Sequence, residues 1–494
     1  MCLLSSGVRN SERLNAGSET RPTAPGRYCR PGLRPGAQQH VSAFQGLEKL
    51  HVTFSKPWKL VALAGLALLA GCTTPTERAE QQKLGQVTAR YRPAGRKPAL
   101  PQLTTNAPLA DFLAYALLNQ PAVEAAYFDW AAAVARITSA GTPPDPQLTF
   151  QADIQSVVTS LMPGFMFNFP GPGKLRAQAA VASAESAGKY HEFESAALAA
   201  ALAVKKAYYQ LYFLTEKIAV NRATLAVLGN VEAVARQRNA VNQATLQDVL
   251  RAQMEQERLR TEIANLEDSR QPLAAQFKAA LGLPADAPEP PLPARFETTP
   301  LTVAPSNLLA AAYAHNPRLK VMASEVQRAE AALDLAAKAG VPDFSAGLMA
   351  DLKMTPLLFR PLASVTLPIW RGKIRAQLAE AQAMKGAAQA RLTGEQIALA
   401  VELAEKTYML REAQRNLTLA QDALLPKARL ALEAARAGYL SNQSSFVDLS
   451  EAWRAQLEAE LDAIAAQTQR ELALAELDVL MRDTPLNDLE KKQP

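Results

Sequence analysis

The sequence predicts a mainly helical protein with a small β part, in which long helical hairpins are duplicated and four short strands cross a membrane. Three observations predict this fold class: two very long helix-forming stretches, alternating segments before each of them, and short sequence matches about 200 residues apart. A chain of 494 residues is long enough for an elongated architecture built from repeats.

The helix-forming stretches are residues 175–238 and 374–437, both rich in Ala, Leu, Gln, Glu and Arg. At ~1.5 Å per residue, each would extend roughly 100 Å. Pro426 lies in the second stretch and should remove one backbone hydrogen bond and kink the helix. Apolar residues of the first stretch recur at spacings of three, four and seven, which predicts a narrow coiled-coil-like stripe: Val204, Tyr208, Leu211, Ile218, Leu225 and Leu228. Such helices form a tube wall or a fibre.

The alternating segments are residues 147–155 and 344–353, with return strands expected at 165–169 and 363–367. About ten alternating residues match a tilted strand that crosses an outer membrane, apolar toward lipid and polar toward a lumen. Half-buried strands of a soluble sandwich are the alternative. Four strands cannot close a barrel, and an open edge cannot lie in lipid, so closure requires several chains.

The two halves match in order and in letters, which indicates a duplication because the offset stays between 196 and 200 residues. We therefore expect a first repeat at 108–283, a Pro-rich linker at 284–305, a second repeat at 306–482 and a polar tail at 483–494. The matches are Asn119-Gln120-Pro121 with His315-Asn316-Pro317, Ala140-Gly141 with Ala339-Gly340, Lys174-Leu175-Arg176-Ala177-Gln178 with Lys373-Ile374-Arg375-Ala376-Gln377, Lys206-Ala207-Tyr208 with Lys406-Thr407-Tyr408, and Asn242-Gln243 and Asp248 with Asn442-Gln443 and Asp448.

A lipoprotein signal peptide is predicted at residues 52–71, where two lysines precede an apolar run that ends in Leu-Ala-Gly before Cys72. Cys72 would become the acylated first residue, and residues 72–107 would be a polar tether. The alternative to a signal peptide is that the apolar run is a short buried helix that ends in a cysteine. Because the signal starts late, we interpret residues 1–51 as a misassigned extension, with translation starting near Val52. Cys2 and Cys29 would then be absent, which leaves no disulfide.

The net charge of +6 gives little support to nucleic-acid binding. Residues 1–51 contain seven Lys/Arg and three Asp/Glu, and residues 52–71 add two lysines, so the remainder is neutral. Phosphate binding needs a clustered basic face, and we expect no nucleic acid among the partners.

A repeated turn follows each long stretch, with Asn at its start and a Ser/Thr-x-x-Asp pattern at the next helix. Thr245 and Ser445 are suitable N-caps, and Asp248 and Asp448 would complete capping boxes. Asparagine tolerates the left-handed conformation that reverses a chain. Capping alone accounts for these residue types; the functional hypothesis is that the tips dock a partner's helical hairpin and that the aspartates form a selectivity ring. The candidate tip residues are Asn242, Gln243, Thr245, Asp248, Asn442, Gln443, Ser445 and Asp448.

Enzyme chemistry and a metal site are not expected. His191 and His315 are 124 residues apart and have no cysteine near them, so neither zinc spacing nor a Ser/His or Cys/His arrangement is present. Several methionines lie near the predicted strands and suggest copper export, but packing or lipid contact is the interpretation we prefer: Met162, Met166, Met349 and Met354. No cofactor is expected apart from the covalent lipid on Cys72.

Together, the Leu-Ala-Gly-Cys box, the duplicated halves, the strand pairs, the long helices and the Asn-x-x-Ser/Thr-x-x-Asp turns resemble the outer-membrane efflux proteins, the TolC-like family, over residues 109–482. Leu425-Pro426 and Ala428 also resemble a segment of that family, whereas members usually have glycine where Asn242 and Asn442 stand.

The resemblance implies a homotrimer in which three chains share a twelve-stranded β-barrel over a helical α-barrel in the periplasm. The tips would meet a periplasmic adaptor and, through it, an inner-membrane pump. Thr73 after the cysteine implies sorting to the outer membrane. The expected function is the passive exit duct of a tripartite efflux system for small molecules or ions. Alternatives are the channel of a type I protein secretion system and a structural coiled-coil lipoprotein.

Overall fold

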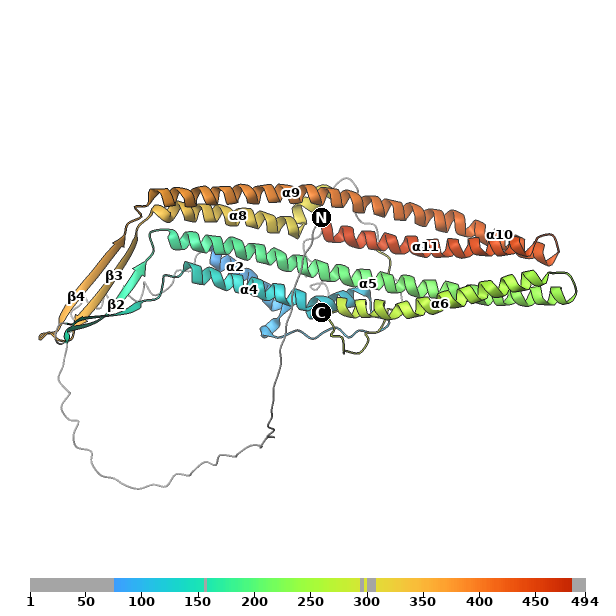
Figure 1. Cartoon of the computed structure of the whole chain (residues 1–494), viewed down its shortest axis with the longest axis horizontal. Helices are drawn as coiled ribbons and strands as arrows, with labels where there is room; N and C mark the ends of the chain where they lie inside the picture. Colours follow the sequence, from blue (N-terminus) through green and yellow to red (C-terminus); the bar gives the residue numbers. More distant parts are fainter. Residues whose placement is uncertain (1–74, 155–157, 294–296, 300–307, 482–494) are drawn as a thin grey trace, which may run out of the picture. The chain divides into compact units, whose positions relative to one another are not determined.

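The computed structural model describes residues 75–154, 158–293, 297–299 and 308–481, all within the unit Gly71–Pro494 (Figure 1). Each half contains two shorter helices, a strand pair, a long helical segment and a return helix, which confirms the predicted fold class. The first half contains α3 (Leu109–Asn119), α4 (Pro121–Gly141), β1 (Gln147–Ile154), β2 (Val158–Phe169), α5 (Lys174–Ala240) and α6 (Leu246–Ala280). The second half contains α7 (Leu308–His315), α8 (Pro317–Ala337), β3 (Asp343–Asp351), β4 (Leu358–Thr366), α9 (Arg371–Thr418), a π-helical segment (Leu419–Leu424), α10 (Leu425–Leu440) and α11 (Phe446–Met481). Cys72, the signal, the leader and the tail lie outside the described residues.

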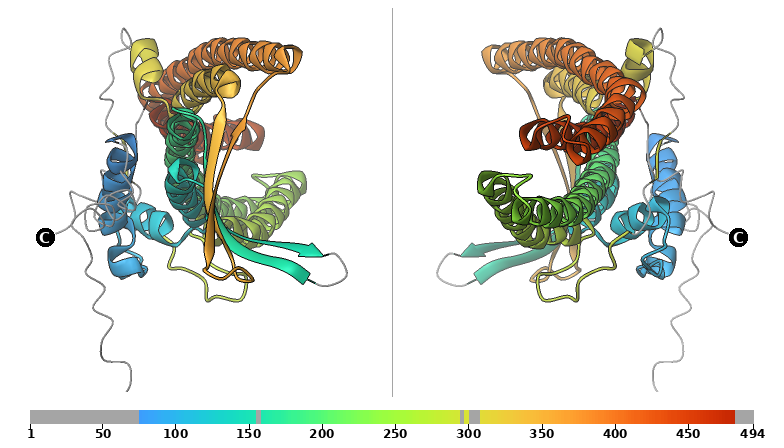
Figure 2. Two further views of the ribbon diagram at one scale, coloured as in Figure 1. Left: turned by 90° about the vertical axis from the view of Figure 1, so that its left-hand side faces the viewer. Right: turned by 90° about the vertical axis from the view of Figure 1, so that its right-hand side faces the viewer.

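The two long helices differ in continuity. Helix α5 runs for 67 residues without a break. In the second half, the six-residue π-helical segment ends just before Pro426 and separates α9 from α10. A proline ring clashes with the carbonyl four residues earlier, and the wider π turn relieves that clash. The predicted interruption at Pro426 is therefore confirmed. Seen end-on, the long helices of this unit follow an arc (Figure 2).

The strands form one antiparallel sheet in the order β1-β2-β3-β4, so the two halves join at β2 and β3. The predicted return strands were too short, because β2 begins at Val158 and β4 at Leu358. Pro163 and Pro361 interrupt the alternation in the sequence, yet each pairs with a neighbouring strand, opposite Phe150 and Leu348 respectively.

The expectation of an extended tether over residues 72–107 is wrong for its first part. Residues Pro75–Tyr91 form helix α2, which packs against α4 and α5. Tyr91 is 2% exposed and joins an aromatic cluster with Trp130 and Phe193, whose rings lie 6.1 Å apart. The carboxylate of Glu77 accepts a hydrogen bond from the hydroxyl of Thr138 at 2.6 Å. The folded body therefore starts well before Leu109.

The repeated Asn/Gln-Pro motifs contact the C-terminal ends of the return helices α6 and α11. The Gln120 side chain donates to the carbonyls of Ala279 and Ala280 at the end of α6, at 3.2 and 3.3 Å. At the equivalent place in the second half, the Asn316 side chain donates to the carbonyl of Leu480 in α11 at 3.1 Å. Since the last carbonyls of a helix lack intrahelical partners, these amides satisfy them.

The linker between the halves forms hydrogen bonds with both halves. The carboxylate of Glu297 accepts from the backbone N–H of Leu109 at 3.2 Å. The backbone N–H of Thr299 donates to Glu471 at 3.0 Å, and Arg470 donates to the Thr299 carbonyl at 3.1 Å. Glu471 is fully buried, and these contacts give its carboxylate the partners that burial requires.

Candidate functional site

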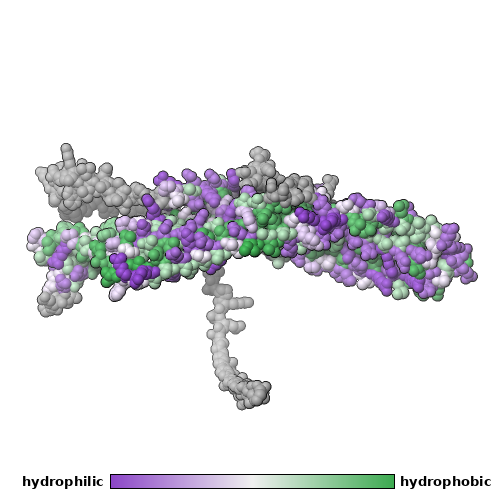
Figure 3. All heavy atoms as spheres, turned by 90° about the horizontal axis from the view of Figure 1, so that it is seen from above, coloured by the Kyte–Doolittle hydropathy of each residue, from purple (hydrophilic) through white to green (hydrophobic). Residues whose placement is uncertain are grey.

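The sheet exposes large apolar side chains on one of its faces. The alternation predicted for β1 and β3 is confirmed, because register places apolar residues opposite one another across every pair of strands, as with Leu148 and Phe165. The exposed members are Leu148, Phe150, Leu161, Phe165, Phe167, Phe169, Phe344, Leu348, Phe359 and Val365, between 39% and 69% exposed. Figure 3 shows apolar atoms at the strand end of the unit and a mixed surface along the helices. An apolar face of this extent marks an interaction surface or lipid contact.

The opposite face is mainly polar, with Leu358 and Leu362 exposed on β4, and it holds three of the methionines. Met162, Met166 and Met349 occupy positions that alternate with the exposed phenylalanines, and Met162 and Met349 are 2% and 8% exposed. This burial agrees with packing and excludes lipid contact for these two. On the same face the Ser160 hydroxyl donates to the buried carboxylate of Asp351 at 3.0 Å.

One described helix, α5, contains a window long and apolar enough to cross a membrane by length and composition. The same helix packs along α4, α6 and α8. Alanine at these contacts permits close helix packing, so we interpret the window as part of the helix packing of this unit.

The hairpin turns have the geometry that the sequence predicted. Asn242 and Asn442 have φ values of 58° and 61°, in the left-handed region. In the first turn, Thr245 caps α6 by accepting from the backbone N–H of Asp248 at 3.2 Å, and the Asp248 carboxylate accepts from the backbone N–H of Thr245 at 3.1 Å.

The second turn has the same reciprocal cap between Ser445 and Asp448, with distances of 3.2 and 2.8 Å. The hydrogen bonds that Ser445 donates from its backbone and hydroxyl lower the pKa of Asp448. Gln243 and Gln443 lie in the turns themselves, where their backbone N–H groups donate to Arg238 and Gly438. The structure thus brings each predicted set of four residues together at one hairpin turn.

Contacts between the two hairpins involve residues that the sequence did not single out. The guanidinium of Arg238, on α5, donates to the carbonyl of Tyr439 and lies 4.7 Å from the centre of its ring. Burial raises the pKa of Tyr439, and the charge of Arg238 partly offsets that rise. Further along, Arg454 of α11 pairs with Glu255 of α6. Arg238 and Tyr439 lie close to the repeated Asn-Gln, which is the only sequence signal that could have indicated them.

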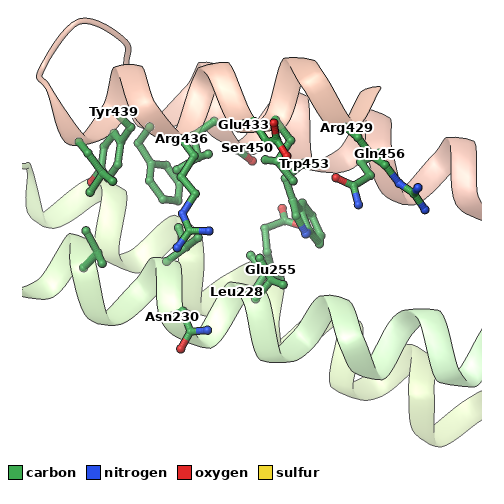
Figure 4. Close-up of a pocket in the computed structure, with 17 residues that line it drawn as sticks. Leu228, Asn230, Glu255, Arg429, Glu433, Arg436, Tyr439, Ser450, Trp453 and Gln456 are labelled. Atoms are coloured by element: carbon green, nitrogen blue, oxygen red, sulfur yellow. The ribbon is translucent and has the colours of Figure 1, made fainter. Parts of the chain in front are cut away.

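A cavity of about 400 Å³ lies between the hairpins, just behind the turns (Figure 4). Its apolar wall includes Leu228 and Trp453, which belong to one buried cluster. Arg436 and Glu433 supply charge from α10. Four helices meet here without filling the space, and the hairpins are joined around the cavity by two small apolar clusters and a few polar contacts.

The histidines have structural surroundings. His191 Nδ1 lies 2.7 Å from the Glu194 carboxylate, and His315 ends α7. Within the described ranges, no three His, Cys, Asp or Glu side chains are grouped so that they could hold a metal ion.

Comparison with known proteins identifies a family region and a set of solved structures with the same fold. Residues 308–481 match the family model described as outer membrane efflux protein. No curated protein matches the chain. The outer membrane protein VceC from Vibrio cholerae is 18% identical with a TM-score of 0.64, and the match covers 76% of this chain and 95% of that one.

Two further structures are similar to the same extent. A membrane protein from Pseudomonas aeruginosa is 20% identical with a TM-score of 0.66, over 78% of this chain and 94% of that one. The open state of the MtrE outer membrane channel from Neisseria gonorrhoeae is 17% identical with a TM-score of 0.65, again over 78% and 94%.

Proposed function

Residues 308–481 place this chain among the outer membrane efflux proteins, and because its body has the fold of solved outer membrane channels, we propose that it is a subunit of a passive efflux duct. Three copies would share one barrel in the outer membrane, and their helices would continue it as a periplasmic tunnel. Energy for export would come from an adaptor and an inner-membrane pump, since a water-filled duct supplies only a route.

The observation that carries this proposal is the sheet. It has an apolar face exposed to the surroundings and two unpaired edges, β1 and β4. An unpaired edge in lipid leaves backbone groups without hydrogen bonds, so a single copy is not a stable membrane structure. Such a sheet argues against the alternative of a structural coiled-coil lipoprotein, because a coiled coil alone does not include one.

Conductance of the purified oligomer tests the proposal. Protein extracted from membranes should run as a heat-sensitive oligomer on a gel and should form water-filled channels in planar bilayers. A monomer without conductance would rule the proposal out. The channel of a type I protein secretion system is the second candidate, and neighbouring genes for a pump or for a secreted protein distinguish the two.

The hairpin tips are proposed as the adaptor-docking surface. The turns place Gln243 and Gln443 at the ends of the two hairpins, at the opposite end of the long helices from the strands (Figure 1). Photo-crosslinkers at these two positions should capture the adaptor in cells, whereas a crosslinker at Gln389 in the middle of α9 should not. Failure at both tip positions would count against docking there.

A lipid anchor on Cys72 is also proposed. Helix α2 begins at Pro75, three residues after that cysteine, and the Glu77–Thr138 hydrogen bond ties its first turn to the last turn of α4, which leads into β1. The start of α2 therefore lies beside the end of α4 that leads into the strands, where the membrane would be. Mass spectrometry of the mature N-terminus tests both the acylation and the cleavage before Cys72.

A further inference from the structure

The internal duplication specifies how one copy of this chain meets the next. We infer that β4 pairs antiparallel with β1 of a second copy, with Arg360 opposite Asp153, and that Lys373 forms an ion pair with Asp145 of that copy. The inference rests on the proposed assembly of several chains and adds its register and contacts.

The two strand pairs are equivalent at a fixed offset. Pro144-Asp145 before β1 corresponds to Pro342-Asp343 before β3, and Asp153 corresponds to Asp351, each 198 residues apart. Pro163 in β2 corresponds to Pro361 in β4 at the same offset. The β1–β2 and β3–β4 registers pair these residues in the same way, with Phe150 opposite Pro163 and Leu348 opposite Pro361. The junction β2–β3 inside one chain is thus a template for a β4–β1 junction between chains.

The template gives a definite register. In β2–β3 the numbers of paired residues always add to 513, as in Phe169 with Phe344 and Gly164 with Met349. Moving β2 forward by 198 residues gives β4, and moving β3 back by 198 gives β1, so the sum is unchanged. Ser364 then lies opposite Thr149 of the next copy.

The side chains support this register independently. Val365, Ala363 and Pro361 on the apolar face of β4 fall opposite Leu148, Phe150 and Ala152 on the apolar face of β1. A slip of one residue would set every apolar side chain against a polar one. All nine residues of β4 are exposed in the single chain, as an unpaired edge requires.

The charges are complementary across the same junction. Within the chain, Lys174 lies 2.7 Å from the Asp343 carboxylate, which also accepts from the backbone N–H of Gly171 at 2.6 Å. The equivalents of the ion pair are Asp145, at the offset of 198, and Lys373, which follows β4 at an offset of 199 in the repeated Lys-x-Arg-Ala-Gln segment. Both are exposed, and neither is in an ion pair within the described part of the chain.

A second charge pair follows from the register alone. Arg360 is half-exposed, and its guanidinium lies 3.8 Å from Asp351, the carboxylate that also holds Ser160. Asp153 of the next copy, which is exposed in the single chain, would face Arg360 directly from the other side. Opposite charges on facing strands stabilise a sheet.

Disulfide trapping tests the register. The full chain carrying Ser364→Cys with Thr149→Cys should form covalent oligomers on oxidation, because directly opposite residues have Cβ atoms close enough to bridge. Ser364→Cys combined with Gln147→Cys or Gln151→Cys, two residues away on the same face, should give at least several-fold less product. The single-cysteine variants supply the background. Equal or greater trapping at position 147 or 151 would overturn the register.

Charge exchange tests the ion pair. Lys373→Asp should lower the temperature at which the oligomer dissociates, Asp145→Lys should do the same, and the double variant should restore it. Lys427→Asp, an exposed lysine on α10, should have no effect. A double variant no more stable than either single one would overturn the pair. Absence of any oligomer in the unaltered protein would instead contradict the proposed function, so the two failures are distinguishable.

Discussion

At the scale of single residues, each hairpin turn is stabilised by two local features. An asparagine adopts the left-handed backbone conformation, and a hydroxyl and a carboxylate three residues apart satisfy each other's backbone N–H groups. Glycine adopts positive φ with less strain than asparagine, so Asn242→Gly and Asn442→Gly are compatible with these turns.

Loss of a capping hydroxyl should loosen the start of the return helix. Thr245→Ala or Ser445→Ala should lower the local opening free energy by about 1 kcal/mol, because one N-terminal N–H loses its acceptor. Hydrogen exchange of residues 246–250 and 446–450 measures this. Thr261→Ala removes an exposed hydroxyl from the interior of α6 and serves as the control; equal effects at all three sites would show that capping is not the cause.

Asp448 should contribute charge at the tip at every pH above its titration. Hydrogen bonds from Ser445 lower its pKa below the ordinary 3.8, so its stabilising effect is complete above 3.8 and is lost as pH falls through the lowered pKa. Asp448→Asn keeps the size of the side chain and removes the charge. If the three copies form a charged ring, single-channel currents of the Asp448→Asn variant at neutral pH should be less sensitive to block by divalent cations than those of the unaltered protein. Unchanged block would show that Asp448 acts only as part of the helix cap.

At the scale of elements, the sequence indicated long helices and strands reliably, but it missed features that depend on distant partners. The alternation of β1 and β3 is local and was visible. Strands β2 and β4 contain Pro163 and Pro361, which interrupt the local alternation, and only the pairing with neighbouring strands shows that each strand continues. Helix α2 is polar along most of its length, so nothing local shows that Tyr91 inserts beside Trp130.

The contacts between the hairpins were equally hidden. Arg238 and Tyr439 are 201 residues apart, and neither belongs to a recognisable motif. Their meeting depends on the packing of the α10/α11 hairpin against the α5/α6 hairpin. Patterns along the chain can locate turns, but they do not show which side chains of two separate turns face each other.

Glu476 joins three helices, because its carboxylate lies 2.5 Å from Lys206 of α5 and 2.9 Å from Lys406 of α9. Burial tends to raise its pKa, but the two lysines outweigh that effect and the pKa is lowered below 4.5. Its contribution to stability is therefore complete above pH 4.5 and is lost as pH falls through the lowered pKa.

Removing this carboxylate should flatten the pH dependence of stability. We expect the melting temperature of the unaltered protein to fall more steeply between about pH 5 and 3 than that of Glu476→Gln. Circular dichroism at 222 nm follows the melting. Glu451→Gln, at an exposed position on the same helix, should show the same pH dependence of the melting temperature as the unaltered protein. If Glu476→Gln also showed that dependence, the ion pairs of Glu476 with the two lysines would contribute nothing to stability.

At the scale of the whole molecule, the proposed anchor and the sheet would be separate means of holding the chain in a membrane. A Cys72→Ser protein with a signal peptide of the non-lipoprotein kind should still assemble into a heat-sensitive oligomer, because the apolar face of the sheet would remain in contact with lipid. Gel mobility of membrane extracts and channel conductance measure the outcome. Loss of the oligomer with normal export of the chain would show that assembly needs the lipid.

The break before Pro426 makes the two hairpins of one chain mechanically unequal. The first is led by a continuous rod of 67 residues, and the second by two rods joined through a six-residue π turn. In a ring of three chains, stiff hairpins and more compliant hairpins would alternate around the axis. The duplication makes the six hairpins of such a ring similar, but their motions would have only threefold symmetry. Any widening of the ring at the hairpin turns would come from the three hairpins that contain the π turn.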